Sequence, residues 1–222
     1  NMYGIPQNAT TVIKIMPASQ STTTIGELPS GGYKWHGGVQ AKDGSIIGVP
    51  AHADEVLRIV PETGEVHTFG GPISKGSYRP DGKYKYGGAV VGVDGNVYCL
   101  PSDTDKVLKV MPKKQETVLL DGPFLECHNK WQNGFSCRDG MIYAIPCNAP
   151  YVLRIDPATG EVQHIGNNWT KAEVTDKWEG GALGPDGAIY CAPQNAKHVL
   201  RINPAVRPRL LSGPTTCWGL AS

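Results

Sequence analysis

The sequence predicts an all-β fold, a five-bladed β-propeller whose blades are four-stranded antiparallel sheets. The first observation is an internal repeat that begins with lysine and an aromatic residue and ends with proline, at 34–50, 85–101, 130–146 and 177–193. The second is an Asp-Gly pair in every copy, with spacings of 51, 45 and 47 residues between Asp43, Asp94, Asp139 and Asp186. The third is that no segment has a helical period over eleven or more residues. Repeats of about 45–50 residues holding four short strands are typical of propeller blades.

Each copy contains two tight turns and the strands that flank them. Asp-Gly between apolar runs predicts a hairpin, because glycine adopts the positive φ that a tight turn requires. The stretch VLRI, at 56–59 and again at 152–155, predicts a half-buried third strand. Pro-x-Thr-Gly follows it at 61–64 and 157–160 and predicts a second turn, after which a weaker fourth strand begins.

The repeat predicts one domain over 1–222, with blades that start near 34, 85, 130, 177 and 217. The chain opens inside a copy, because 1–17 aligns with 188–204, so 1–30 would supply the outer strands of a first blade. Cys217 and Trp218 resemble the start of a further copy, so the two termini are expected to share one blade and close the ring. Asn1 in place of an initiator Met indicates a processed chain or a fragment, and a longer array of blades is the alternative.

Composition bounds the class of partner. The 222 residues carry 21 Lys and Arg against 20 Asp and Glu, a net charge of +1, and no run of like charges. A near-neutral chain of this kind argues against nucleic acid or an anionic membrane as the main partner. No apolar stretch approaches 18 residues, so neither membrane insertion nor a recognisable signal peptide is predicted.

The repeated unit GPDGxIYxxPxxxxxVLRIDPxTGEV resembles the blades of the NHL, streptogramin-lyase and gluconolactonase-like propellers. The resemblance covers nearly the whole chain, but it lies mostly in turn and packing residues, which specify a blade rather than a reaction. These families include lyases, lactone hydrolases and binding modules, so the fold alone does not decide the function. The resemblance also implies that the loop before each Lys-aromatic pair and the loop after each YCxP-like strand lie on one face, the top face.

A first ring of candidate binding residues follows from that placement. It contains the repeated lysine and the aromatic residue after it: Lys34, Trp35, Lys85, Tyr86, Lys130, Trp131, Lys177 and Trp178. One interpretation is a cationic, aromatic channel mouth that receives an anionic ligand or stacks on a sugar. The alternative is that the aromatic residues wedge between blades while each lysine stem covers them and its ammonium stays in water.

A second ring consists of the residue that follows the aromatic residue in each copy. These residues differ between copies, as the residues of a catalytic site would. The ring contains His36, Gly87, Gln132 and Glu179, and Gly219 in the C-terminal segment. His36 is a candidate general base and Glu179 its partner, and Gln132 is a further candidate binding residue. A solvated histidine and glutamate are the alternative. No metal site or cofactor is predicted, because Asp103 and Asp105 lack the other oxygen ligands of a calcium loop.

Cysteines and glycosylation motifs bear on the compartment. Cys99 and Cys191 occupy equivalent strand positions and are expected to be buried free thiols, whereas a disulfide is predicted between Cys127 and Cys147. Asn8 and Asn168 each begin an N-glycosylation motif. An even number of cysteines and two such motifs favour an extracellular or secretory-lumen location, with the cytoplasm as the alternative.

The sequence therefore favours a non-catalytic propeller, a rigid binding or scaffold module for a protein or glycan partner at the top face. Such a module could also be a subunit of a larger extracellular assembly. The first alternative is a lyase or lactone hydrolase with a site at the top of the central channel. The second is a sugar-binding lectin that uses the aromatic ring. The oligomeric state stays open.

Overall fold

The computed structural model of the chain describes residues 1–169 and 174–204, which form five antiparallel sheets. The first sheet contains β1 (Met2–Gly4), β2 (Val12–Met16) and β3 (Ser21–Ile25), with the 3-10 turn η1 (Pro17–Ser19) between the last two. The second contains β4 (Trp35–Gln40), β5 (Ile46–Pro50), β6 (Val56–Val60) and β7 (Glu65–Phe69). The third contains β8 (Tyr86–Val91), β9 (Val97–Pro101), β10 (Val107–Met111) and β11 (Glu116–Leu120).

The fourth sheet contains β12 (Trp131–Ser136), β13 (Ile142–Pro146), β14 (Val152–Ile155) and β15 (Val162–Ile165). The fifth contains β16 (Trp178–Leu183), β17 (Ile189–Pro193) and β18 (Leu200–Ile202). In every sheet each strand pairs with the next one along the chain, so the topology is up-and-down throughout. The predicted all-β fold of repeated antiparallel sheets is confirmed.

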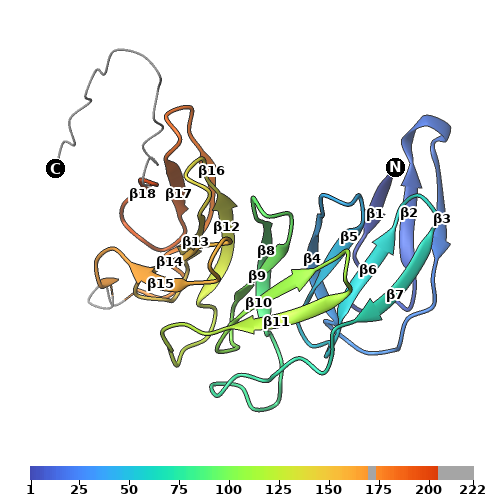
Figure 1. The fold of residues 1–222 in the computed structure, drawn as a ribbon, viewed down its shortest axis with the longest axis horizontal. Coiled ribbons are helices and arrows are strands. Elements are labelled where there is room, and N and C mark those ends of the chain that lie inside the picture. The colour runs from blue at the N-terminus through green and yellow to red at the C-terminus, as the bar shows by residue number, and fades with distance from the viewer. Residues whose placement is uncertain (170–173, 205–222) are drawn as a thin grey trace.

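The five sheets stand side by side along an arc, with β4, β8, β12 and β16 on its concave side (Figure 1). The first sheet begins with the equivalent of a second strand, because β1 pairs with β2 as β5 pairs with β6. β1 and β18 lie at opposite ends of the arc in Figure 1, so the described sheets do not close a ring. The segment expected to close it, which includes Cys217, Trp218 and Gly219, lies outside the described residues, and closure stays a prediction.

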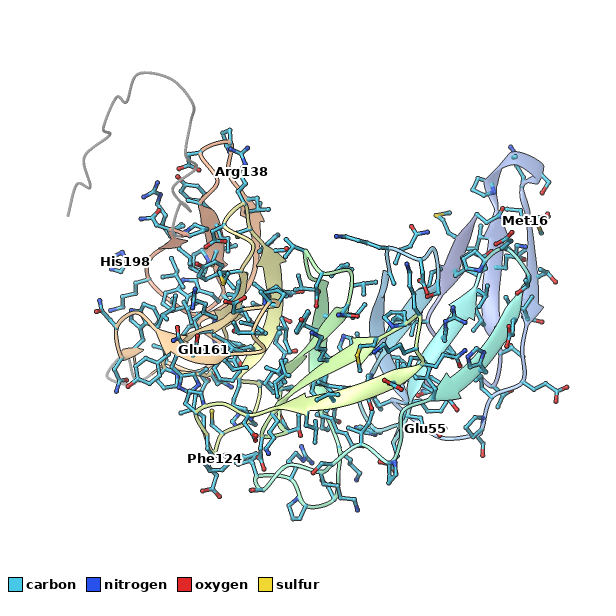
Figure 2. The ribbon with its side chains drawn as sticks, viewed as in Figure 1. Met16, Glu55, Phe124, Arg138, Glu161 and His198 are labelled. Carbon is cyan, nitrogen blue, oxygen red and sulfur yellow. The ribbon has the colours of Figure 1, made fainter. Side chains whose placement is uncertain are left out.

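The core lies between neighbouring sheets rather than inside any one of them. Between the second and third sheets, Ile47 and Val49 of β5 pack with Tyr86 and Cys99. Figure 2 shows how side chains fill the space from sheet to sheet along the arc. A sheet with two apolar faces must be covered on both sides, which is why the blades form a stack.

The Asp-Gly turns are fixed by a recurring network around the aspartate. The Asp94 carboxylate accepts the backbone N–H of Asn96 at 3.2 Å and the Tyr98 hydroxyl at 2.8 Å, and Lys109 Nζ lies 3.0 Å away. Tyr98 and Lys109 face each other across β9 and β10. The same tyrosine-to-aspartate bond occurs at Asp139 and Tyr143 and at Asp186 and Tyr190. One carboxylate thus ties a turn, the second strand and, where a basic residue reaches it, the third.

Removing the buried copy of this tyrosine bond is expected to cost more than removing the exposed copy. Tyr98 is fully buried, whereas Tyr190 is 40% exposed and makes the equivalent bond to Asp186. Tyr98→Phe should lower the free energy of unfolding by about 1.5 kcal/mol, and Tyr190→Phe by about 0.5 kcal/mol. Chemical denaturation of both variants measures the difference, and equal losses would show that burial does not set the strength of this bond.

Stability is expected to decrease in acid, partly through Asp94. Partial burial acts to raise the pKa of Asp94, but hydrogen bonds from Asn96, Lys109 and Tyr98 outweigh it and hold the pKa below its ordinary value. The ionised form therefore favours folding at a pH above about 4, and this contribution is lost as the pH falls through the folded-state pKa. In urea unfolding from pH 7 to pH 2.5, Asp94→Asn should be less stable at pH 7 and approach the parent at low pH. A constant difference at every pH would contradict this assignment.

Candidate functional site

The repeated lysines connect each sheet to the one before it. Their backbone N–H groups donate to carbonyl groups in the loop of the preceding sheet, at 2.9–3.1 Å, from Lys34 to Gln7, Lys85 to Ala51, Lys130 to Ser102 and Lys177 to Cys147. The lysine carbonyls in turn accept N–H groups from the loop of their own sheet, such as Ala51 to Lys34 at 2.9 Å. The loops before the inner strands and after the second strands therefore lie together, as the resemblance implied, and we call this surface the top face.

The lysine side chains are buried, between 1% and 5% exposed, and their ammonium groups bond inside the protein. Lys85 Nζ donates to the carbonyl oxygens of His52 at 3.2 Å and Ala53 at 3.1 Å, and it pairs with the Asp54 carboxylate at 2.9 Å. Burial lowers the pKa of Lys34, Lys130 and Lys177. The expectation that the ammonium groups stay in water is wrong, because the top-face loops fold over them.

The aromatic partners of these lysines are equally buried. The indole N–H groups of Trp35, Trp131 and Trp178 donate to backbone carbonyls of their own sheets at 2.8–2.9 Å. Tyr86 is 1% exposed in the core between the second and third sheets. The aromatic residues pack between blades, as the alternative interpretation expected, and the first ring presents little surface to a ligand.

The second ring lies in β-bulges. The pairing of each inner strand with its neighbour shifts just after the aromatic residue, between Trp35 and Gly38 in β4 and between Trp131 and Gly134 in β12. A bulge re-aims side chains and bends a strand, and such irregularities are common beside functional sites. A Cβ at Gly88, in the bulge of β8, would collide with the Gln132 carbonyl oxygen, so neighbouring inner strands approach closely there.

His36 and Glu179 lie on different sheets of the described structure, and their predicted catalytic roles stay predictions. His36 is exposed on β4 and Glu179 is exposed on β16, with β8 and β12 between them, and no hydrogen bond joins them. Gln132 Nε2 is half-buried and donates to Ser102 Oγ at 3.1 Å and Asn129 Oδ1 at 3.2 Å, so it braces the top face. In residues 1–169 and 174–204 no three His, Cys, Asp or Glu side chains are placed to hold a metal ion.

The predicted disulfide is absent, and Cys127 and Cys147 are free thiols. The Cys147 thiol faces the Asp176 carboxylate at 3.5 Å. Burial, reinforced by Asp176, raises the pKa of Cys147 to about 12. Sharing one end of the fourth sheet does not bring the two sulfur atoms together. Cys99 and Cys191 are buried and free, as predicted.

The glycosylation motifs stay untested. Asn8 and Asn168 are both exposed, and Asn8 Oδ1 accepts the Tyr33 N–H at 2.8 Å. Thr170, the last residue of the second motif, lies outside the described residues. No described helix is long and apolar enough to span a membrane.

The residue before each repeated lysine was not among the predicted site residues, yet in two copies it belongs to an exposed aromatic cluster. Tyr33, Tyr84, Asn129 and Asp176 all have positive φ, between 46° and 52°. Asparagine and aspartate tolerate this left-handed conformation, whereas for a bulky residue such as tyrosine it is strained. Tyr33 and Tyr84 nevertheless remain 49% and 38% exposed, with His52 between them at centroid distances of 5.4 and 4.6 Å. The signal for this cluster was that these four positions differ between copies while the lysine after them does not.

The long link between β7 and β8 adds a second pair of rings to the cluster. Ser77 anchors this link, because its N–H and hydroxyl both donate to the Asp105 carboxylate at 2.8–3.0 Å. Tyr78 stacks on His128 at 5.7 Å, and the Arg79 guanidinium lies 4.9 Å from the Tyr84 ring centroid. A shallow hollow of about 390 Å³ results, lined by Tyr78, Arg79, Tyr84, Asp103, His128 and Asn129.

Comparison with solved structures shows which known proteins share this arrangement of sheets. Virginiamycin B lyase from Staphylococcus aureus superposes with a TM-score of 0.71 at 12% identity, over 91% of this chain and 62% of that one. The fold is that of a β-propeller. A catalytically inactive His-to-Ala variant of that lyase with quinupristin superposes at 0.67 and 13% identity, over 88% of this chain and 60% of that one.

The extracellular domain of a protein assigned to the hybrid two-component systems of B. thetaiotaomicron also has this fold. It superposes at 0.54 and 12% identity, over 83% of this chain and 25% of that one. The propeller described here thus spans less than two thirds of the length of each of these chains. No protein-family model and no curated protein matches the sequence. At these identities the likeness establishes the fold and leaves the site to be argued from its residues.

Removing one buried lysine should destabilise the propeller, whereas removing its exposed neighbour should not. Lys85→Met leaves two carbonyls and the Asp54 carboxylate without their donor, at a cost of about 2 kcal/mol. For a protein of this size that corresponds to a decrease of roughly 4–8 °C in Tm. Lys83→Met is the control, because its side chain is 52% exposed and pairs only with the exposed Asp81. Differential scanning fluorimetry of both variants tests this, and equal Tm values would refute the inter-blade role.

Proposed function

We propose that the chain is a non-catalytic propeller module that recognises a partner through the aromatic cluster of its top face. The observation that carries this proposal is the strain at Tyr33 and Tyr84. A left-handed backbone at a bulky residue costs of the order of 1–3 kcal/mol, and such strain concentrates at functional sites. Both rings are partly exposed and contact other surface side chains, so core packing does not compensate that cost. A tyrosine is retained there because its side chain contacts something outside the chain.

The rest of the top face supports recognition. The lysine network holds the loops rigidly, which reduces the entropy lost when a partner binds. Aromatic rings that are partly exposed and already ordered are the usual anchors of interfaces. An extracellular location, with glycans at Asn8 and Asn168, belongs to this proposal and accords with the extracellular domain that shares the fold.

A lyase or lactone hydrolase is the second candidate, favoured by the lyase with the same fold and the loss of activity in its His-to-Ala variant. His36 is the exposed histidine at a bulge and would act as the base in such an enzyme. Its partner Glu179 lies on the fifth sheet, with two blades between it and His36, and no hydrogen bond joins them. General acid–base catalysis needs both groups within hydrogen-bond reach of one substrate, which this separation does not supply. The recognition role is therefore preferred.

Substitution of the two strained tyrosines tests the proposal without knowledge of the partner. Asparagine is the residue that this chain itself uses at the equivalent position before Lys130. The double variant Tyr33→Asn, Tyr84→Asn should keep or raise Tm, by up to roughly 4 °C, because it relieves backbone strain at exposed sites. Differential scanning calorimetry provides the measurement.

The reverse substitution is the matched control. Asn129→Tyr places a third tyrosine in the left-handed conformation and should lower Tm. A clear loss of stability in the asparagine double variant would mean that the tyrosines serve the scaffold, and the proposed recognition surface would fall. A catalytic role for His36 and Glu179 would be supported instead if a lyase or lactonase assay gave a bell-shaped pH profile lost in His36→Ala.

A further inference from the structure

We infer that the hollow lined by Tyr78, Tyr84 and Asp103 binds an uncharged sugar unit of a glycan. This inference rests on the proposed recognition function and specifies its ligand. The hollow is built from three separate segments, which are the β7–β8 link, the loop after β9 and the loop before β12. Its volume of about 390 Å³ lies in the range of about 300–1,000 Å³ that is usual for small-ligand sites.

The rings of the hollow offer flat faces to a sugar. Tyr78 is 42% exposed and stacks nearly parallel to His128, with an interplanar angle of 26°. Arg79 lies over the Tyr84 ring and holds it. A pyranose presents C–H groups on its two faces, and these pack against aromatic faces as other apolar surface does. Two aromatic faces at the hollow can thus orient one sugar ring.

The floor of the hollow supplies oriented polar groups. Asp103 is only 3% exposed, and its Oδ1 accepts the Ser102 hydroxyl at 3.0 Å and the Asn129 N–H at 2.8 Å. Its Oδ2 has the Arg79 guanidinium 3.6 Å away, longer than a hydrogen bond, so it keeps acceptor capacity. A carboxylate beside a guanidinium and an amide can accept from and donate to vicinal hydroxyl groups in pairs.

The charge balance selects an uncharged sugar. Arg79 and Lys83 both pair with Asp81, and Arg79 also faces Asp103, so two cations meet two carboxylates. Among the residues that line the hollow, Arg79 supplies the cation and already faces two carboxylates, so a phosphorylated, sulfated or uronic-acid ligand would be repelled by Asp103. The row of Tyr33, His52 and Tyr84 continues beyond the hollow, with Tyr33 and Tyr84 centroids 6.0 Å apart. This extension favours an oligosaccharide over a monosaccharide.

A peptide fits the hollow less well than a sugar. Peptide recognition commonly uses an exposed strand edge, an apolar groove for a helix, or a groove for a proline-rich segment. The rings here alternate with a buried carboxylate and a guanidinium, and the lining of the hollow belongs to none of these three arrangements. The sugar is therefore the ligand that we test first.

The experiment is isothermal titration calorimetry with neutral hexasaccharides of glucose, mannose and N-acetylglucosamine, after a screen on an array that also carries sulfated and uronic-acid glycans. At least one neutral glycan should bind, with a Kd that is unchanged between 50 mM and 500 mM NaCl. Tyr84→Ala and Tyr78→Ala should each raise that Kd roughly tenfold. Asp103→Asn should raise it at least as much.

Tyr190→Ala is the matched control. Tyr190 is also 40% exposed and has Arg201 over its ring at 5.7 Å, but it lies outside the hollow on β17. The Kd of the Tyr190→Ala variant for the glycan should equal that of the parent protein. Circular dichroism and Tm confirm that each variant is folded before titration.

Two results would contradict the proposal that the hollow binds a neutral sugar. The first is the absence of binding to every neutral glycan by a folded protein, and the second is binding that Tyr78→Ala and Tyr84→Ala leave unchanged. If a proline-rich or other peptide from a peptide array binds and Tyr84→Ala abolishes that binding, the recognition function is supported and the sugar proposal is wrong. If the asparagine double variant at positions 33 and 84 also loses stability, the recognition function itself falls.

Discussion

The lysine and aromatic residue at the start of each inner strand form the link on which the rest of the structure depends. The aromatic ring packs in the core between sheets, and the lysine N–H donates to a carbonyl group in the loop of the preceding sheet. The ammonium groups of Lys34, Lys85 and Lys177 also reach carbonyl groups of that loop, whereas Lys130 bonds to the Cys127 carbonyl before its own strand. A single sheet of this kind has two apolar faces and is not stable alone, so the joint between sheets is the unit of stability. Because that joint lies at one end of every sheet, it also makes the top face a continuous, ordered surface.

This constraint explains where recognition residues can appear. The backbone of each top-face loop makes the hydrogen bonds of the joint, and the lysine and its aromatic partner are buried, so both present little surface to a ligand. Freedom remains at the residue just before the lysine and in the long link before β8. Tyr33, Tyr84 and Tyr78 occupy those places, and Asp103 is turned toward them by Ser102 and Asn129. Residues that are the same in every copy build the propeller, and residues that differ between copies give the top face its chemical character.

The sequence patterns located the sheets, but the aromatic residues of the first candidate binding ring are buried in the structure. Trp35, Tyr86, Trp131 and Trp178 stand out because they recur, and recurrence marks a packing position. The disulfide between Cys127 and Cys147 failed for a related reason, because two cysteines at one end of a sheet need not have the Cα separation and Cβ directions that an S–S bond requires. His36 and Glu179 differ between copies, as site residues should, yet two blades separate them. Strain at Tyr33 and Tyr84 was invisible in the sequence, because φ depends on the loop that holds each residue.

Local sequence patterns were enough to predict the repeat, the strand order, the Asp-Gly turns and the position of each inner strand. These features are local, since turn chemistry and alternation of apolar residues act over a few neighbours. Packing between the sheets buries the lysine ammonium groups, keeps Cys127 and Cys147 apart, and brings rings from two segments together beside Asp103. Those outcomes depend on distances between residues about 20 to 50 positions apart, which the packing of one sheet on the next sets and no local pattern encodes.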